Sequence, residues 1–459
     1  GLCLVGSEMC IRDRSETVQK VKVITRKDID NQAANSLKDL LDKEMNMRLS
    51  YDNVLGSSVS IQGISGQNVK ILIDGVPVIG RLNGDIDLSQ INLNNISKVE
   101  IIEGPLSVDF GTDALAGTIN LITNKDSKNT FSSSYNLFYE SVGNYNADLS
   151  LSYSLKNHYI GLDVGRKYFD GWSVNDDFTL FPISEPADTN RTKSWNPKEQ
   201  YFGKIQYKFN TNQNTYRIYY DIYDEKITNL GYPRLPYFES AFDDYYLTKR
   251  NNLGFDIDYN LNEFKKIKIL SSYNDYKRIK NTYYKDLTTL EEILTNSSSD
   301  QDTSRFNLFM NKLVFSSFSN ELINYQIGFD SKFELAKGQR INNNQRSLGD
   351  HAIFLTSKWS PTNYFSLRPA FRFSYNSKFN VPIIPSLNAI YKHNNYTLRF
   401  SYAKGFRSPS LKELFFEFVD INHNIIGNKN LDSENSDNFQ INVDFSSKFS
   451  NYKLEYGLS

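Results

Sequence analysis

From about Phe131 onward, apolar and polar residues alternate along the chain with a period of two. Because successive side chains of a β-strand point to opposite faces, this period predicts strands with one apolar and one polar face. We count about fifteen such strands, and no long helix, between Phe131 and Ser459. The clearest examples are Tyr216–Ile222, Phe365–Tyr375, Tyr396–Ala403 and Phe439–Phe445.

The connections between these strands alternate between short and long. Short polar turns are expected near 156–157, 210–214, 261–264, 317–320, 361–363, 393–395 and 450–451. Longer connections are expected at about Phe169–Glu199, Lys226–Lys249, Asn281–Thr303, Lys337–Asp350 and Lys404–Ser436, with shorter ones near Gly143 and Asn376–Asn380. A transmembrane barrel sorts its loops by side in this way. We therefore predict a transmembrane antiparallel β-barrel over residues 126–459, with a soluble β-protein such as a propeller as the alternative.

Residues 15–125 carry a different pattern, which predicts one small α+β domain. Ser36 is a suitable helix N-cap, and Asp39 three residues later completes a capping box. An apolar stripe follows this cap, made of Leu37, Leu40 and Leu41. We expect this short amphipathic helix to pack on a sheet.

Short β-runs and glycine turns dominate the rest of this domain. Asp74-Gly75 lies between two apolar runs and predicts a hairpin, because glycine tolerates positive φ. Gly104-Pro105 is expected to end the next strand, since proline has no N–H for a β-ladder.

Composition excludes several classes of protein. The net charge of −1 gives no reason to expect nucleic acid as a partner. Tyr (30) and Phe (31) are abundant although the mean hydropathy is −0.51, which suits a surface that alternates polar and aromatic side chains. We find no nucleophile–base pair, phosphate loop or Cys/His cluster, so we predict neither an enzyme nor a bound cofactor.

The opening residues 1–14 differ from everything that follows. Both cysteines, Cys3 and Cys10, lie here without further metal ligands nearby. The segment has no basic start followed by an apolar stretch, as a signal peptide would. We interpret it as a non-native scar that resembles translated adaptor sequence, and we expect the native signal peptide to be missing.

Four motifs resemble the plug domain of the TonB-dependent outer-membrane receptors in order and spacing: Ser60–Gly63, Leu72–Pro77, Val99–Pro105 and Phe110–Thr123. A fifth stretch, Lys404–Leu414 with Gly427–Leu431, resembles the family's late extracellular loop. The resemblance covers nearly everything from Ser15 onward and implies a plug inside the lumen of a barrel of about 22 strands. The motif positions that matter most are Gln62, Gly63, Asp74, Gly75, Glu103, Gly104, Pro105, Gly111 and Gly117.

Two of these positions depart from the family pattern. Family members often carry arginine where this chain has Gln62 and Glu103, and those arginines are thought to pair with barrel carboxylates. How the plug is held here is therefore open. The chain also has about seven strands fewer than the family's barrel, so we expect a fragment cut at both ends, with the TonB box lying before Ser15.

The resemblance implies TonB-dependent active transport of a scarce ligand across the bacterial outer membrane. The expected ligand is an iron–siderophore complex or a corrinoid, and the expected partners are TonB with its inner-membrane energising complex and the outer-membrane lipid, around a monomer. Residues 78–90 look like the corresponding stretch of vitamin B12 receptors, although a structural turn common to the family explains Asp87–Gln90 at least as well. A glycan importer of the same superfamily and a passive porin are the alternatives.

Candidate ligand contacts lie in the plug and in the long connections. In the plug they are Arg81, Leu82 and Asn83, and for Arg81 the alternative is a solvated loop charge. In the long connections an aromatic lining is expected from Trp172, Tyr232, Tyr237, Tyr245 and Tyr246, with an interfacial aromatic belt as the alternative. Weak calcium candidates are Asp170, Asp176 and Asp177, which as a loop cluster are more often simply solvated.

Overall fold

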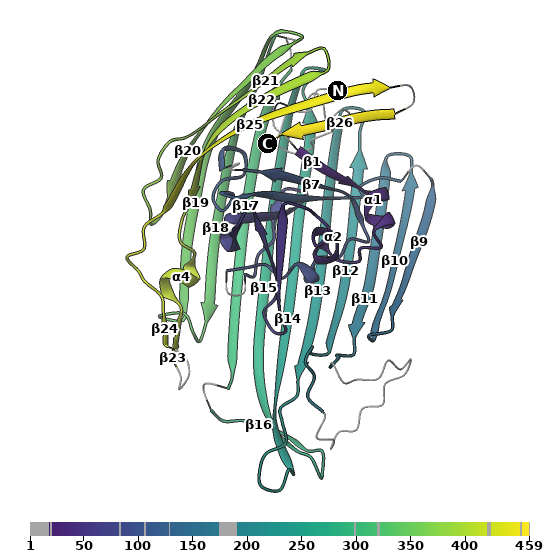
Figure 1. Ribbon diagram of the computed structural model, residues 1–459, viewed down its shortest axis with the longest axis vertical. Coiled ribbons are helices and arrows are strands. Elements are labelled where there is room, and N and C mark those ends of the chain that lie inside the picture. Colours follow the sequence, from purple (N-terminus) through teal and green to yellow (C-terminus); the bar gives the residue numbers. More distant parts are fainter. Residues whose placement is uncertain are drawn as a thin grey trace.

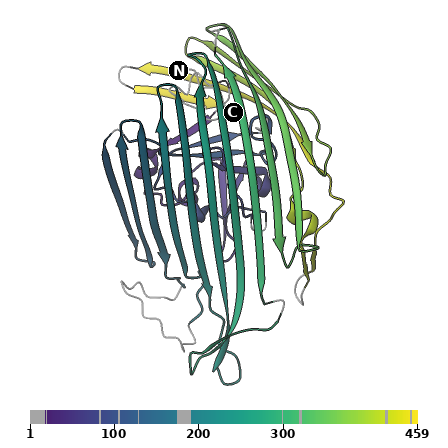
Figure 2. The same ribbon diagram turned by 180° about the vertical axis from the view of Figure 1, so that it is seen from behind.

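A large antiparallel sheet curves around a small α+β unit in the computed structural model (Figure 1). The view from behind shows the strands of this sheet covering the unit (Figure 2). We call the unit (residues 21–123) the plug and the sheet the barrel wall. The structure describes residues 18, 21–81, 84–104, 107–127, 129–173, 191–297, 300–318, 322–419, 424–449 and 452–458.

The plug contains a five-stranded sheet in the order β1-β7-β8-β5-β6 and a three-stranded sheet in the order β2-β3-β4. Only β5 and β8 pair in parallel among these strands. The bounds are β1 Val21–Thr25, α1 Arg26–Asn31, α2 Leu37–Leu41, β2 Met47–Asp52, β3 Gly56–Ile61, β4 Ile64–Ser65, η1 Gly66–Asn68, β5 Val69–Ile73, β6 Val76–Pro77, η2 Leu88–Gln90, β7 Ile96–Glu103, α3 Ser107–Phe110 and β8 Gly117–Thr123.

Two local predictions for the plug are confirmed. Helix α2 begins after Ser36, whose side chain accepts from the backbone N–H of Asp39 in a complete capping box. Its apolar stripe is fully buried in the main plug core. The hairpin of β5 and β6 turns at Asp74 and Gly75, which both have positive φ (52° and 84°).

The barrel wall is a 16-stranded sheet in the described part of the chain, and β16 is the strand that lies off its continuous path. The continuous path from β9 to β26 agrees with the predicted count of about fifteen strands. Between β22 and β25 the chain also forms helix α4 and the separate strand pair β23–β24. The bounds are β9 Phe131–Glu140, β10 Asn144–Leu155, β11 His158–Phe169, β12 Lys198–Asn210, β13 Asn214–Asn229, β14 Ser240–Asn260, β15 Lys265–Asp286, β16 Glu292–Leu294, β17 Asp302–Ser317, β18 Ile323–Gly338, β19 Gln345–Thr362, β20 Phe365–Asn376, β21 Ile384–His393, β22 Tyr396–Arg407, α4 Leu411–Phe415, β23 Glu417–Val419, β24 Asn424–Ile426, β25 Glu434–Phe449 and β26 Tyr452–Leu458.

The apolar phase of each strand faces outward and the polar phase faces the plug. On β20, Phe371 and Phe373 are 43% and 54% exposed, whereas Arg368 and Arg372 are 2% and 1% exposed. This is the reverse of a water-soluble sheet packed on an apolar core, and it is the arrangement of a strand with lipid outside and polar contents inside. None of the helices in the described residues is long and apolar enough to cross a bilayer.

The connections are sorted by side as predicted, but several are shorter than expected. The stretch predicted as the connection Lys226–Lys249 is a loop only at 230–239, and Lys337–Asp350 is a loop only at 339–344. Backbone pairing continues beyond the apolar band, for example between Thr228 and Tyr245. Outside that band the outward face does not contact lipid, so its side chains need not be apolar. The alternation of apolar and polar residues therefore fades although the strands continue. The long β14 and β15 reach far below the plug in Figure 1.

Candidate ligand-binding site and plug attachment

Asp74, at the β5–β6 turn, ties the plug to the barrel wall. Its Oδ2 accepts a hydrogen bond from Thr123 Oγ1 at 2.7 Å and one from Arg217 Nη1 of β13 at 3.0 Å. Lys125 Nζ lies 3.3 Å from Oδ1. Burial alone raises the pKa of Asp74, but Lys125, Arg217 and Lys204 together hold it well below its ordinary value. The turn therefore presents an ionised carboxylate to the wall.

Two further plug carboxylates contact wall cations. Lys198 Nζ of β12 lies 3.6 Å from Asp87 Oδ2, and Arg368 Nη2 of β20 donates to Asp109 Oδ1 at 3.0 Å. Burial raises the pKa of Asp87, whereas Lys198 and hydrogen bonds from Ser57 and Ser89 lower it, with a net value below the ordinary one.

Wall cations also reach plug backbone carbonyls. Lys312 Nζ donates to the carbonyl of Asp109 at 2.7 Å, and Arg278 Nη2 donates to that of Val54 at 2.8 Å. Gly111 permits such an approach, because a Cβ there would lie 2.9 Å from the guanidinium of a wall arginine. In these contacts the wall supplies donors and the plug supplies acceptors.

The two departures from the family pattern are explained by contacts inside the plug. Gln62 Nε2 donates to Glu103 Oε2 at 3.1 Å, and Asn46 Nδ2 donates to Glu103 Oε1 at 3.2 Å. These side chains bind each other rather than a wall carboxylate. Arg217 and Arg368 of the wall show the opposite polarity, with the cation on the barrel and the carboxylate on the plug.

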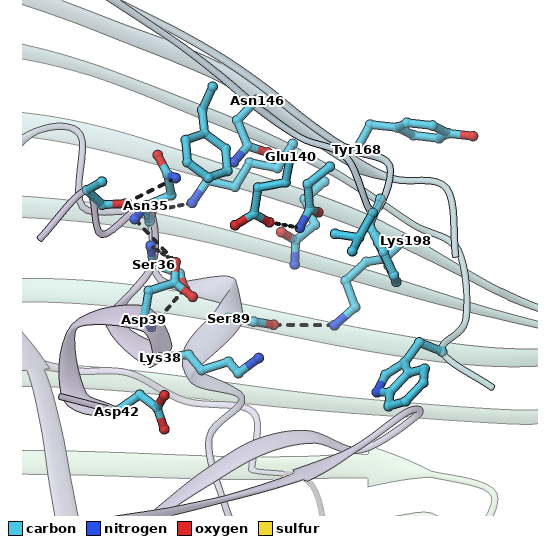
Figure 3. Close-up of a pocket in the computed structure, with 18 of the residues that line it drawn as sticks. Asn35, Ser36, Lys38, Asp39, Asp42, Ser89, Glu140, Asn146, Tyr168 and Lys198 are labelled. Carbon is cyan, nitrogen blue, oxygen red and sulfur yellow. Dashed lines mark hydrogen bonds between the residues drawn. The ribbon is translucent and has the colours of Figure 1, made fainter. Parts of the chain in front are cut away.

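A cavity of about 770 Å³ lies between the α2 side of the plug and strands β9 to β12 (Figure 3). It lies at the end of the wall that carries the long connections, because Val142 of the β9–β10 connection and residues of the β11–β12 connection line it. Its lining combines charged and amide groups with six aromatic rings, those of Tyr51, Phe138, Tyr168, Phe169, Trp172 and Trp195.

Most charges in this lining are already satisfied by neighbours. Lys167 donates to the carbonyl of Asn35, and Lys198 donates to Ser89 Oγ at 3.3 Å, the contact drawn in Figure 3. Lys38 lies 4.8 Å from the ring centre of Tyr51. The cavity therefore offers mainly aromatic faces and hydrogen-bonding groups rather than a strong net charge.

Of the predicted aromatic contacts, Trp172 lines this cavity. It pairs with Trp195 through two backbone hydrogen bonds of 3.0 and 2.9 Å, and their ring centres lie 5.1 Å apart. Tyr232 and Tyr237 lie in the β13–β14 connection, 76% and 79% exposed, and are not among the lining residues. The cavity thus brings together one of the five predicted rings with others that the sequence did not single out.

The prediction that placed Tyr245 and Tyr246 in a long connection is wrong, because both lie within β14. As neighbours on a strand they point to opposite faces. Tyr245 donates to Glu292 Oε1 of β16 at 3.0 Å, whereas the guanidinium of Arg278 lies 5.2 Å from the ring centre of Tyr246. Since Arg278 also binds the plug, Tyr246 faces the lumen.

Arg81 is held by the plug itself. Its guanidinium donates to the carbonyls of Gly66, Gly84 and Val69 at 3.0, 3.1 and 3.1 Å. Burial lowers the pKa of Arg81. These bonds make it a brace for the loop, and its contact with a ligand stays a prediction. Leu82, Asn83 and Pro105 lie outside the described residues.

The calcium candidates remain a prediction. Asp170 Oδ1 accepts a hydrogen bond from Tyr168 at 2.9 Å, and Asp176 and Asp177 lie outside the described residues. In the part of the chain that the structure describes, no three His, Cys, Asp or Glu side chains gather as a metal site.

Sequence reasoning missed the plug side of the cavity and Trp195. The capping box of α2 was interpreted only as a structural device, yet Ser36 and Asp39 also line the cavity. A signal for Trp195 was present, because the chain has only three tryptophans and two of them bracket one connection.

Comparison with known families gives two matches. A family model described as TonB-dependent Receptor Plug Domain matches residues 13–118. A second, described as TonB dependent receptor-like, beta-barrel, matches residues 188–456. The matched ranges correspond to the plug and to most of the wall.

Solved structures share this fold at low sequence identity. The siderophore receptor PirA from Acinetobacter baumannii is 17% identical with a TM-score of 0.73, over 95% of this chain and 69% of that one. A mutant of the ferric enterobactin receptor PfeA from Pseudomonas aeruginosa, in complex with enterobactin, is 15% identical with a TM-score of 0.73, over 95% and 71%. The ferric yersiniabactin uptake receptor FyuA from Yersinia pestis is 13% identical with a TM-score of 0.68, over 97% and 72%.

Proposed function

Because this chain belongs to the TonB-dependent receptor family, we propose that it imports an iron–siderophore complex across the bacterial outer membrane with energy delivered by TonB. The observation that carries the proposal is the plug held inside the wall, with an aromatic cavity on the side of the long connections. A plugged lumen does not admit solutes by simple diffusion. A ligand must bind outside and be released inward by work done on the plug, and the outer membrane has no nucleotide energy source of its own.

The chemistry of the cavity supports a chelate rather than a simple anion. Six aromatic rings line a space of about 770 Å³, which falls within the size range of small-molecule pockets. Rings stack on aromatic or planar groups, and the amides of Asn144 and Asn146 add hydrogen bonds. The similar structures named above are receptors for siderophores by their descriptions, which favours the same ligand class here.

A corrinoid is less well supported. Its case rests on residues 78–90, which resemble vitamin B12 receptors. Asp87 and Gln90 of this stretch are buried, and Gln90 Nε2 donates to Glu225 of the wall at 2.9 Å while Arg250 donates to Gln90 Oε1 at 3.0 Å. These contacts favour the explanation as a structural turn. A glycan importer and a passive porin remain outcomes that the experiment below distinguishes.

The test is uptake by cells. A strain without its own receptor for the chosen ligand carries the natural gene of this protein, and the accumulation of radioactive iron supplied as ferric siderophore is measured. We expect accumulation that stops when the proton-motive force is dissipated or TonB is deleted. Accumulation that survives both treatments would indicate a porin.

Growth of a knockout strain on limiting iron or on limiting B12 separates the ligand classes. A defect on limiting iron alone supports the siderophore. A defect on limiting B12 alone supports the corrinoid, and growth without any defect on either contradicts both, leaving the glycan importer to be tested with oligosaccharides.

A further inference from the structure

The lining of the aromatic cavity carries both signs of charge. Its acidic groups are Asp39 and Asp42 of the plug and Glu140 of β9. Figure 3 shows Glu140 on the wall side of the cavity, across from Asp39. No arginine of the described residues lines the cavity, and its basic groups are lysines: Lys38, Lys43, Lys167 and Lys198. The charge that a ligand meets therefore depends on which of these groups already have partners.

Lys198 is held by carboxylates that do not line the cavity. Its Nζ lies 3.6 Å from Asp87 Oδ2 and 3.8 Å from Glu225 Oε2. All three side chains are buried or nearly so, with exposed fractions of 11% or less. The positive charge of Lys198 is thus offset from behind, and little of it is left for a ligand.

The other lysines of the lining also have partners within the protein. Lys43 and Lys167 each donate to a backbone carbonyl of the plug. Lys38 lies over the ring of Tyr51, 4.8 Å from its centre. A ligand that needs these ammonium groups would have to displace contacts that already exist.

The three carboxylates, in contrast, have no cationic partner among the described residues. Asp39 accepts from two backbone N–H groups that precede α2, at 3.2 and 2.9 Å. Glu140 accepts from Asn144 Nδ2 at 2.6 Å. Neutral donors leave the negative charge in place, and the side chains of Asp42 and Glu140 are exposed. The cavity therefore presents negative charge without a local counter-ion.

Ferric siderophores differ in charge according to the groups that bind the iron. Three catecholate dianions around one Fe³⁺ make a trianion, whereas three hydroxamate monoanions make a neutral complex. A trianion in this cavity would be repelled by the carboxylates, most strongly where protein excludes water. A site for such an anion is expected to offer arginine, whose planar fork suits anionic oxygens, and the lining has none among the described residues.

The aromatic rings favour the opposite sign of charge. The face of a tryptophan ring attracts an ammonium group, and Trp172 and Trp195 lie together in the lining. The same rings offer apolar surface to the methylene chains that link hydroxamates. A hydroxamate with a free ammonium group would find partners both in these rings and in the carboxylates.

We propose that this cavity selects ferric hydroxamates, above all those with a free ammonium group, over anionic catecholates. The inference rests on the import of iron–siderophore complexes proposed above and names the class of siderophore. It is carried by the carboxylates without counter-ions and by the lysines whose contacts are already made.

The test compares three iron complexes by titration against the purified natural protein. Ferrioxamine B is a tris-hydroxamate with a free ammonium group, its N-acetylated derivative is neutral, and ferric enterobactin is a tris-catecholate trianion. We expect ferrioxamine B to bind about twofold to fivefold more tightly than the acetylated complex. We expect ferric enterobactin to bind at least about tenfold more weakly than the acetylated complex. Equal binding of the two hydroxamates, or binding of ferric enterobactin as tight as theirs, overturns the proposal.

A variant with fewer charges sharpens the test. Asp42→Asn/Glu140→Gln keeps the size of both side chains and removes two negative charges. We expect the preference for ferrioxamine B over its acetylated form to fall towards one, and the affinity for ferric enterobactin relative to that form to rise at least about threefold. Because these are ratios, a fraction of misfolded protein does not change them. Ratios equal to those of the unaltered protein overturn the proposal.

The matched control is Glu239→Gln. Glu239 is an exposed carboxylate in the β13–β14 connection, at the same end of the wall, but it does not line the cavity. Both ratios are expected to stay as in the unaltered protein, and an equal change there shows that overall charge, not the cavity, selects the ligand. Tight binding of ferric enterobactin overturns the charge selection alone, whereas binding of none of the three complexes overturns the import of siderophores as well.

Discussion

At the scale of a single residue, Asp74 sets how firmly the β5–β6 turn is held. Asp74→Asn keeps the shape but removes the charge shared with Arg217 and Lys125. Removing one partner of a buried ion pair costs about 3–5 kcal/mol, and Arg217 retains Asp256, so we expect a loss near the lower end. Denaturant unfolding of the detergent-solubilised protein measures it.

The matched control is Asp30→Asn. Asp30 also pairs with an arginine, Arg26, but its side chain is 62% exposed. We expect a loss below about 1 kcal/mol. If both variants lose the same stability, burial of the Asp74 pair is not what holds the turn.

The same carboxylates predict an acid limit to stability. The pKa values of Asp74 and Asp87 are lowered in the folded protein. Their contribution is therefore fully present above the ordinary aspartate pKa of about 3.9 and is lost as pH falls through the lower folded values. We expect unfolding free energy to fall below about pH 4, with a shallower decline in Asp74→Asn. If the unfolding free energy falls equally steeply with decreasing pH in the unaltered protein and in Asp74→Asn, then Asp74 does not cause the acid limit.

At the scale of elements, the β11–β12 connection is closed by a pair of rings beside the cavity. Trp172→Ala and Trp195→Ala each remove an aromatic face worth about 0.5–1.5 kcal/mol. We expect ligand affinity to fall about threefold to tenfold in each, measured by titration of the ferric siderophore against the purified protein. Trp359→Ala is the control, because this exposed tryptophan lies near the short-turn end of β19 and should leave affinity unchanged.

Helices and turns could be predicted from the sequence where residues close to one another in the chain determine them. The capping box at Ser36 and the turn at Asp74 needed only neighbouring residues. Helix α1 was not predicted, although Thr25 and Asp28 form a capping box, because Ile29 is its only buried residue and no apolar stripe is visible. The strand ends of β14 were misplaced because alternation stops before backbone pairing does.

At the scale of the whole molecule, the contacts that join plug and wall lie far apart in sequence. Arg217 is 143 residues from Asp74, and Arg368 is 259 residues from Asp109. Local patterns carry no information about such pairs, so the fold class was predictable while the reversed polarity of these two ion pairs and the cavity were not. Gln62 and Glu103 indicated only that the attachment differs.

Removing the plug is the corresponding prediction for the molecule. Deleting residues 15–125 from the natural protein empties the lumen, and we expect a large rise in ion conductance across a planar bilayer, with ferric siderophore binding lost. A protein that conducts equally with and without this segment is a passive porin.

The first strand of the plug, β1, is held so that a pulling force can separate it from the plug sheet. β1 pairs with β7 alone, over five residues, at the edge of the plug sheet. Val21 and Val23 pack with Ile102 in a small cluster outside the main core. Of the residues of β1, only Ile24 belongs to the main core. A pulling force on the chain before β1 therefore acts first on the five-residue pairing between β1 and β7. An applied force can therefore detach β1 from the sheet while β7, β8, β5 and β6 stay paired.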